Sequence, residues 1–214
     1  MYKLIENQMI VPNIHLMRLE APIVAKQMKP GQFVILRADE VGERIPLSVS
    51  DWDAEKGTIT VIFMNVGSTT NKLALLESGI SIPTVVGPLG NPTEIEKFGT
   101  VLCLVGCYGI GSIYPIARTL KEKGNKVIIV VEARSSFLFF WEDRLEEVSD
   151  KIFYITRDGT KGYRGHVGIL PEIIKSANET IDRIIINGCT FLLKRGSDVS
   201  KPLGIKTVVS LNPI

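Results

Sequence analysis

A glycine-rich turn is the clearest chemical feature of this sequence. In the stretch "VLCLVGCYGIGSIYPIARTLKEKG", residues 106–111 separate an apolar run from a helical pattern. Glycines permit a tight turn, and the amino end of the following helix supplies N–H donors and a positive dipole. A tight turn without any ligand fits the same pattern, and the bulk of Cys107 and Tyr108 favours that alternative. The candidates for binding a dinucleotide pyrophosphate are the glycines Gly106, Gly109 and Gly111.

Two charged residues follow the next apolar run. Glu132 ends that run, where a carboxylate can accept hydrogen bonds from an adenosine ribose and disfavour a 2′-phosphate. This interpretation predicts NAD(H) rather than NADP(H). Arg134 instead favours NADP(H), because a guanidinium group suits a phosphate. Glu132 also fits an ordinary solvated carboxylate at a strand end.

The stretch "ERIPLSVSDWD" combines a cation, an apolar surface and a hydroxyl. A flavin ring needs an apolar platform and a hydroxyl near its reactive N5 atom, and a diphosphate needs a cation. Ser48 is the candidate for the position near N5. The predicted flavin-binding residues of this stretch are Arg44, Pro46, Leu47 and Ser48.

A second turn, in "NVGSTTNKLALL", precedes a short helical pattern. Exposed N–H groups and three hydroxyls at a helix start can bind cofactor phosphates. A well-capped helix without a ligand explains the same residues. The candidates are Gly67, Ser68, Thr69 and Thr70.

The elements that position these residues change in character along the chain. Short alternating runs at 32–37 and 58–64 predict an antiparallel β-barrel. After Thr100 the runs are apolar throughout, which is typical of a parallel sheet covered by helices. We therefore expect a flavin-binding barrel domain at 1–98 and a Rossmann-like α/β domain at 99–214. The helix after the glycine-rich turn is expected to span 112–123.

The composition of the chain limits which partners and which cellular location we expect for the protein. The chain has 25 basic and 23 acidic residues, spread evenly, so nothing indicates nucleic acid. Without a long apolar run or a signal-peptide pattern, we expect no membrane association and a cytoplasmic location. The three cysteines lack metal-ligand spacing, and we expect Cys103 and Cys189 to be buried thiols.

Five stretches carry a resemblance that runs the length of the chain. They are "RIPLSVSDWDAEKGTITVIFMNVGSTTNKLALL", "VVGPLGNP", "SIYPIARTLKEKGNKVI", "WEDRLEEVSDKIF" and "LGIKTVVSLNPI". The chain resembles the small (alpha) subunits of NADH-dependent ferredoxin:NADP oxidoreductase, also known as sulfide dehydrogenase subunit beta. More distantly, it is similar to the electron-transfer subunit of dihydroorotate dehydrogenase and to the ferredoxin-NADP reductase superfamily.

The resemblance implies an FAD-binding barrel followed by an NAD-binding α/β domain. In the family, the arginine and the Pro-Leu-Ser/Thr segment contact FAD, and these positions match Arg44 and residues 46–48. The family's "VGxxT" turn lies at the FAD diphosphate and matches residues 67–70. The resemblance further implies a heterodimer with a larger flavin and iron–sulfur subunit, which passes electrons to ferredoxin.

The sequence departs from this family in three places. "GCYGIGSI" stands where the family has Gly-Gly-Gly-Val-Gly-Ile-Ala-Pro, and residues 188–191 replace a Gly-Pro segment near the nicotinamide. The family continues into a cysteine-rich segment that ligates a [2Fe-2S] cluster, and none of the three cysteines here can stand in for it. Either the sequence is truncated before that segment or the chain is a paralogue that has lost the cluster. Two functions therefore compete: a redox enzyme subunit, and a non-catalytic assembly or regulatory paralogue that keeps the fold but has lost NAD binding.

Overall fold

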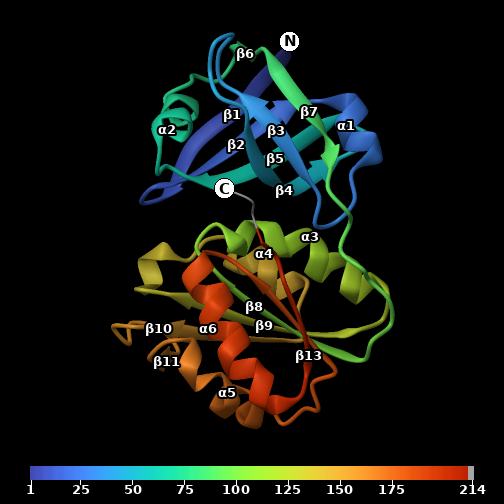
Figure 1. The fold of residues 1–214 in the computed structure, drawn as a ribbon, viewed down its shortest axis with the longest axis vertical. Helices are drawn as coiled ribbons and strands as arrows, with labels where there is room; N and C mark the ends of the chain where they lie inside the picture. Colours follow the sequence, from blue (N-terminus) through green and yellow to red (C-terminus); the bar gives the residue numbers. More distant parts are fainter. Residues whose placement is uncertain (212–214) are drawn as a thin grey trace. The chain divides into compact units, whose positions relative to one another are not determined.

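The computed structural model describes residues 1–211 and divides into two compact units. Unit 1 comprises Met1–Thr93, and unit 2 begins at Glu94. Each unit has its own sheet (Figure 1). That the two units fold as separate domains stays a prediction.

Unit 1 is built on an antiparallel sheet. Within the described residues the sheet has seven strands, in the order β6-β1-β2-β5-β4-β3-β7. Shifts of register between β1 and β2, β3 and β7, and β4 and β5 bend the sheet into a barrel-like wall. The elements are β1 (Tyr2–Val11), β2 (Ile14–Glu20), α1 (Pro22–Gln27), β3 (Phe33–Arg37), β4 (Ile45–Asp53), β5 (Thr58–Met64), α2 (Ser68–Ala74), β6 (Ser81–Ile82) and β7 (Thr84–Leu89).

Alternation of side chains explains how these strands form a core. In β3, Val34 and Leu36 are completely buried while their neighbours are partly exposed, as expected where successive side chains point to opposite faces. Residues Leu4, Met17 and Ile59 from other strands join the same cluster. The antiparallel barrel predicted from the runs at 32–37 and 58–64 is confirmed.

Unit 2 is built on a parallel sheet. The part of the chain that the structure describes gives this sheet six strands, in the order β11-β10-β9-β8-β12-β13. The strands are β8 (Thr100–Gly106), β9 (Lys126–Ala133), β10 (Lys151–Thr156), β11 (Tyr163–Arg164), β12 (Arg183–Asn187) and β13 (Lys206–Val209). The helices are α3 (Gly109–Glu122), α4 (Glu142–Glu147), α5 (Leu170–Ala177) and α6 (Thr190–Ser200), with single 3₁₀ turns η1 (Ser136–Leu138), η2 (Val167–Ile169) and η3 (Lys201–Leu203).

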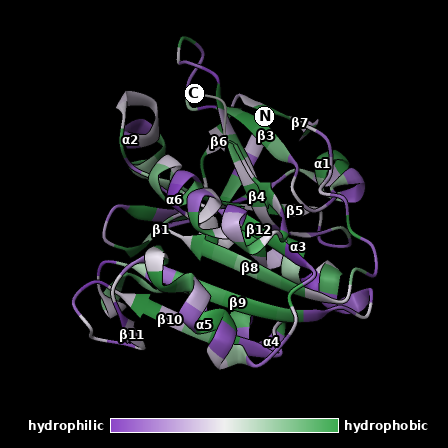
Figure 2. Cartoon of the chain, turned by 60° about the horizontal axis from the view of Figure 1, so that its bottom comes forward, coloured by the Kyte–Doolittle hydropathy of each residue, from purple (hydrophilic) through white to green (hydrophobic). Residues whose placement is uncertain are grey.

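Helices cover both faces of this sheet (Figure 1). α3 and α4 pack on one face, while α5 and α6 pack on the other. Strands β8, β9 and β12 are buried almost throughout, and Figure 2 shows β8 and β9 as hydrophobic ribbons between the helices. The parallel sheet predicted from runs that are apolar on both faces is thereby confirmed.

The predicted start of the helix after the glycine-rich turn is wrong by three residues. α3 begins at Gly109 rather than Ser112, so Gly109 and Gly111 belong to its first turn. The predicted end is close to the observed one. Gly124 has φ of 78°, its amide donates to Lys121, and the amide of Asn125 donates to Leu120. These two bonds form a Schellman motif, in which glycine takes the left-handed position at no steric cost.

No helix among residues 1–211 combines the length and the apolar character needed to cross a membrane.

Candidate functional site

The predicted flavin-binding strand of unit 1 is largely accessible. Arg44 immediately precedes β4 and is exposed, as is Pro46, while Leu47 and Ser48 are half-buried. Leu47 pairs in register with Val34 of β3 and packs against the core of unit 1. The strand therefore fixes the backbone of residues 46–48 and leaves the Arg44 guanidinium group free to meet an anion.

The second predicted motif forms the tight turn that begins α2. The Thr70 hydroxyl oxygen accepts hydrogen bonds from the amides of Val66 and Gly67, both at 3.0 Å. It also donates to the Gly67 carbonyl oxygen at 3.1 Å. Thr70 therefore closes the turn, and Ser68 remains exposed beside it.

The structure brings these two motifs together. The Thr69 hydroxyl donates to the Glu43 carboxylate at 3.2 Å, and Glu43 adjoins Arg44. Lys72 of α2 forms an ion pair with Asp39 at 2.9 Å, which ties the same loop to the helix a second time. The hydrogen bond with Lys72 also lowers the pKa of Asp39 below its ordinary value. The cation of one motif and the turn of the other thus lie side by side.

Gly67 leaves free space at this place. Its φ of −154° is open to any residue, and a Cβ atom there would have only the Thr70 hydroxyl within 4.0 Å. Neither the backbone nor the packing of unit 1 therefore requires glycine at this position. An exposed arginine beside an uncrowded turn fits a bound diphosphate, so these residues are suited to FAD.

The glycine-rich turn of unit 2 lies where the strand order of the sheet reverses. β8 pairs with β9 on one side and with β12 on the other, although β12 comes much later in the chain. Ligands of open α/β sheets bind in the crevice at such a switch point, outside the carboxyl ends of the strands. The position of the glycine-rich turn at this switch point and the amino end of α3 therefore both fit the binding of a dinucleotide.

The glycines of this turn, in contrast, face the protein's own backbone. A Cβ on Gly106 would lie 2.8 Å from the Glu132 carbonyl oxygen. A Cβ on Gly109 would lie 2.6 Å from the Gly188 amide nitrogen and closer still to the Asn187 carbonyl oxygen. The close approach of the turn to the strands on either side therefore accounts for both glycines.

Side chains fill the rest of the turn. The Tyr108 hydroxyl donates to the Gly188 carbonyl oxygen at 3.0 Å, which ties the turn to the loop between β12 and α6. Cys107 has φ of 53°, in the left-handed region that favours glycine. The open space of a three-glycine turn is absent between residues 106 and 109.

The sequence did not predict that the loops of Cys107 and Cys189 lie side by side. Both cysteines are half-buried, and a Cβ on Gly188 would lie only 2.9 Å from the Gly106 carbonyl oxygen, so the loops that carry them approach closely. Cys103 is fully buried as predicted, but the prediction of a buried thiol at Cys189 is wrong, because that residue caps α6 at the sheet edge. The signal available in the sequence was that Cys107 directly follows one apolar run and that Cys189 comes two residues after another.

Glu132 lies at the end of β9 beside this turn. Its carboxylate accepts a hydrogen bond from the Val167 amide at 2.9 Å and lies 3.5 Å from the Arg157 guanidinium group. The residue is only 6% exposed, and burial raises its pKa. Arg134, two residues further on, is exposed. The roles of both residues toward a ribose or a phosphate stay predictions.

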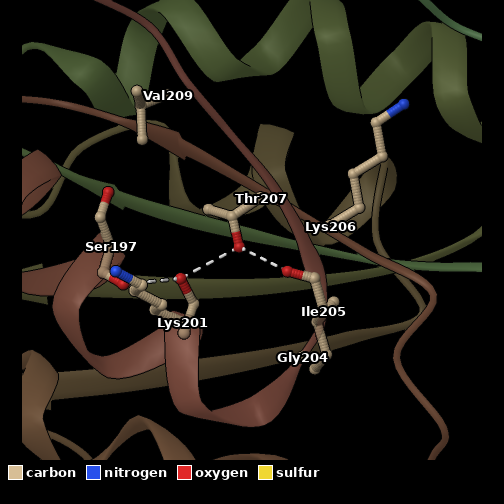
Figure 3. A pocket seen from close by; sticks show the side chains of 8 residues that line it. Ser197, Lys201, Gly204, Ile205, Lys206, Thr207 and Val209 are labelled. Carbon is tan, nitrogen blue, oxygen red and sulfur yellow. Dashed lines mark hydrogen bonds between the residues drawn. The ribbon is translucent and has the colours of Figure 1, made fainter.

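A separate hollow lies beside the carboxyl-terminal half of α6. It measures about 490 Å³ and is bordered by η3 and β13 (Figure 3). Inside it the Thr207 hydroxyl interacts with Ser200 and with the Ile205 carbonyl oxygen, both at 3.0 Å. None of the predicted site residues lines this hollow. Among residues 1–211 no group of three or more potential metal ligands gathers either.

The fold matches that of known flavoproteins. A ferredoxin NADP+ reductase from Neisseria gonorrhoeae, solved with bound FAD and NADP, superposes with a TM-score of 0.79 at 15% identity, covering 98% of each chain. The chain thus has a ferredoxin-NADP reductase-like fold. The structure of an NADH-dependent reduced ferredoxin-NADP oxidoreductase is more similar, with a TM-score of 0.92 and 36% identity over all of this chain and 77% of the other.

Sequence comparison identifies the family. The chain is 40% identical, over 92% of its length, to a dihydroorotate dehydrogenase B (NAD(+)) electron transfer subunit homolog from Thermotoga maritima, of which it covers 69%. It is 30% identical to the corresponding subunit from Bacillus pumilus, covering 91% of this chain and 76% of that one. The chain belongs to this family of electron transfer subunits, which confirms the resemblance noted in the sequence. No family model matches it.

Proposed function

We propose that this chain is an oxidoreductase subunit that transfers electrons between a pyridine nucleotide and FAD, and onward to a partner subunit. The observation that supports this most is the meeting of Arg44 with the turn at residues 67–70 through the Thr69–Glu43 hydrogen bond. Two motifs that the sequence separates then form one anion-binding surface. The names of the relatives point to the same class of protein.

Each residue of this surface has a distinct role toward FAD. Arg44 pairs with the diphosphate, and the turn that begins at Gly67 provides the space and the polar groups around it. Pro46 and Leu47 give the apolar contact for the ring, and Ser48 offers its hydroxyl near N5. When bound, FAD supplies the exchange between two-electron hydride chemistry and single-electron transfer.

For the pyridine nucleotide, the site is the carboxyl edge of the sheet in unit 2. The amino end of α3 would bind the pyrophosphate beside Gly106, Gly109 and Gly111. Glu132 would disfavour a 2′-phosphate, so the preferred nucleotide is NAD(H), while Arg134 is the residue that would oppose this preference.

The partner we propose is a larger subunit that carries flavin and iron–sulfur centres, and ferredoxin receives electrons through that subunit. Single electrons need an acceptor centre at short range, and the three cysteines of this chain cannot ligate a [2Fe-2S] cluster. The relative from Thermotoga maritima is itself named an electron transfer subunit.

Flavin binding by the purified chain tests the first part of the proposal. Arg44→Ala should weaken FAD binding by about 1.5–3 kcal/mol, because it removes a charge-assisted contact. Arg18→Ala is the matched control: Arg18 is an arginine of unit 1 that pairs with Glu6 at 2.8 Å, and FAD titration should show no change. A chain that takes up no FAD on reconstitution, or equal losses in both variants, would contradict the site.

A second candidate function follows from the filled turn of unit 2. The chain could be a non-catalytic assembly or regulatory relative, since Cys107 and Tyr108 occupy the place where a nucleotide would approach. Anaerobic mixing of the flavin-loaded chain with NADH separates the two. Bleaching of the flavin supports the enzyme, whereas a flavin that bleaches with neither NADH nor NADPH supports the alternative.

A further inference from the structure

We propose that Asn7 is a positioning residue for the FAD site of unit 1. Its side chain holds the carboxyl end of α2, and through that helix it sets the place of the turn at residues 67–70 beside Arg44. The inference rests on the proposed function, because the diphosphate of FAD is the ligand that this turn would bind. Asn7 lies near the start of the chain, outside both stretches from which the flavin site was predicted.

Three carbonyl oxygens at the end of α2 surround the Asn7 amide group. Its Nδ2 atom donates to the Leu76 carbonyl oxygen at 2.7 Å and to the Leu73 carbonyl oxygen at 2.9 Å. The Ala74 carbonyl oxygen lies 3.4 Å from the same nitrogen. The last four carbonyl groups of a helix have no amide partner further along the helix, so a side-chain donor can serve them. Asn7 therefore caps the carboxyl end of α2 from a distant strand.

The surroundings of the Asn7 amide group also explain why asparagine stands here. All three neighbours of Nδ2 are acceptors, and only the nitrogen of an asparagine side chain can donate to them. The Oδ1 atom is buried, and within residues 1–211 it has no hydrogen-bond partner. A buried polar atom without a partner costs free energy. The bonds that the nitrogen donates are therefore what this residue contributes.

The strand that carries Asn7 is held by the sheet on one side and meets α2 on the other. Asn7 pairs in register with Met17 of β2, which is completely buried. On the outer side of β1, among the described residues, β6 pairs only with Tyr2 and Lys3, and α2 packs against the strand further along (Figure 1). The sheet thus fixes the backbone of Asn7, and its side chain links the sheet to α2.

α2 depends on such links because it is short. It has seven residues, whereas isolated helices below about 12–15 residues are marginal in water. Its apolar anchor is Leu73, which is completely buried in the core of unit 1. The hydroxyl of Thr69 donates to Glu43, and the ammonium group of Lys72 pairs with Asp39. The polar contacts of α2 therefore join β1 to the loop before β4.

These contacts connect Asn7 to the diphosphate. Without the bonds at its carboxyl end, α2 keeps its apolar anchor and its two contacts to the loop that precedes Arg44. The turn at residues 67–70 and Arg44 then have more freedom before FAD binds, and binding has to restore their arrangement at a cost in affinity. Asn7 acts through α2 and is not itself a contact of the ligand.

The first experiment is a double-mutant cycle on FAD affinity. Asn7→Ala should lower the affinity of the purified chain for FAD about three- to tenfold, the effect of losing hydrogen bonds of ordinary strength. In an Arg44→Ala background the same change should lower it less than about twofold, because the residue that Asn7 helps to place is gone. A purely stabilising role predicts the same factor in both backgrounds.

Asn7→Asp adds a readout in the pH profile. An ionised aspartate has nearly the shape of asparagine but donates no hydrogen bond to Leu73 or Leu76, whereas a protonated aspartate donates again. The affinity of this variant for FAD, relative to wild type, should be low at about pH 8 and recover severalfold toward about pH 5, because carbonyl acceptors favour the protonated form. Gln8→Glu is the matched control. It makes the same amide-to-carboxylate change at the next residue of β1, which is exposed, and its FAD affinity should follow wild type at both pH values.

The outcomes distinguish this proposal from the proposed function. A loss of affinity in Arg44→Ala with none in Asn7→Ala overturns the positioning role and leaves the FAD site standing. Wild-type chain that binds no FAD, or Arg44→Ala without any loss, shows that the FAD site itself is wrong, and the positioning role falls with it.

Three further results overturn the positioning role alone. They are equal factors in the two backgrounds, an Asn7→Asp variant whose relative affinity does not change with pH, and an Asn7→Ala chain that circular dichroism shows to be unfolded. Each means that Asn7 supports unit 1 as a whole rather than the site. If Asn7→Asp does not fold, the cycle with Asn7→Ala decides.

Discussion

The turn at Gly67 and the turn at Gly106 both place glycine at the start of a helix, yet they use it differently. In unit 1 a Cβ on Gly67 would enter open space beside an exposed arginine. In unit 2 the Cβ atoms of Gly106 and Gly109 would strike the backbone of neighbouring strands. The first glycine leaves room for a ligand, whereas the other two are required by the fold itself.

This difference changes which of the two motifs is the stronger evidence for a bound ligand. The glycine-rich turn of unit 2 looks more like a nucleotide site in the sequence, but its packing explains its glycines without any ligand. The turn of unit 1 looks like an ordinary capped helix, but nothing in its packing explains Gly67. A glycine motif is therefore best judged by what a side chain at that position would meet.

Gly109→Ala should have the largest effect. Alanine is the better helix former by about 1 kcal/mol, which alone would stabilise α3. The overlap with Asn187 and Gly188 opposes this, and because it involves backbone atoms we expect a net loss of about 3 kcal/mol in the free energy of unfolding. Urea unfolding measures this, and a stability equal to wild type would remove the packing explanation for the turn.

Gly67→Ala makes the same chemical change in the other turn. The free energy of unfolding should fall by only about 0.5–1 kcal/mol, since the backbone and the space both accept a Cβ and alanine is merely a poorer N-cap residue than glycine for α2. The affinity for FAD should fall about tenfold, or about 1.4 kcal/mol, because the methyl group occupies the proposed phosphate space. Unchanged FAD affinity in a folded variant would place the diphosphate elsewhere.

Cys107→Gly tests whether the side chain is what closes the turn of unit 2. Glycine accepts the left-handed backbone without strain, which stabilises the folded state. It also gives the unfolded chain more conformational entropy, so the two effects should nearly cancel in the free energy of unfolding. Removal of the thiol should increase NADH affinity several-fold, as measured by titration. If NADH binds no better, Tyr108 or the Gly188 contact is the obstacle instead.

Glu132→Gln should have the smallest effect, seen as a change in the pH dependence of the free energy of unfolding. Burial raises the pKa of Glu132 in the folded state, so its contribution to stability is greatest below the unfolded value of about 4.3 and is lost as pH rises through the raised folded value. Glutamine can still accept the Val167 hydrogen bond and does not titrate. Relative to wild type, the variant should therefore gain stability as pH rises above about 4.3 and through the raised folded-state pKa. A constant or falling difference in urea unfolding would contradict the raised pKa.

The sequence by itself determined the architecture. The runs at 32–37 and 58–64 predicted β3 and β5. β3 alternates between buried and partly exposed side chains, as a half-buried strand does, whereas β5 is buried throughout its centre. Runs such as "VLCLVG" and "KVIIVVE", apolar on both faces, predicted the covered parallel sheet because only burial on two sides stabilises them. The terminal run "KTVVSL" likewise matches β13. Gly124 ended α3 as expected, since a helix end depends on residues within one turn of it.

Only the tertiary structure decided which residues meet. The hydrogen bond between Thr69 and Glu43, the Glu132 contacts with Val167 and Arg157, and the hydrogen bond from Tyr108 to Gly188 all join segments far apart in the chain. Tyr108 reaches Gly188 because β12 returns to the side of β8, and a local pattern of apolar residues does not specify which strand becomes a neighbour. Strand order is set by the packing of the whole sheet and its helices, so the chemistry at its switch point follows from the fold rather than from any single motif.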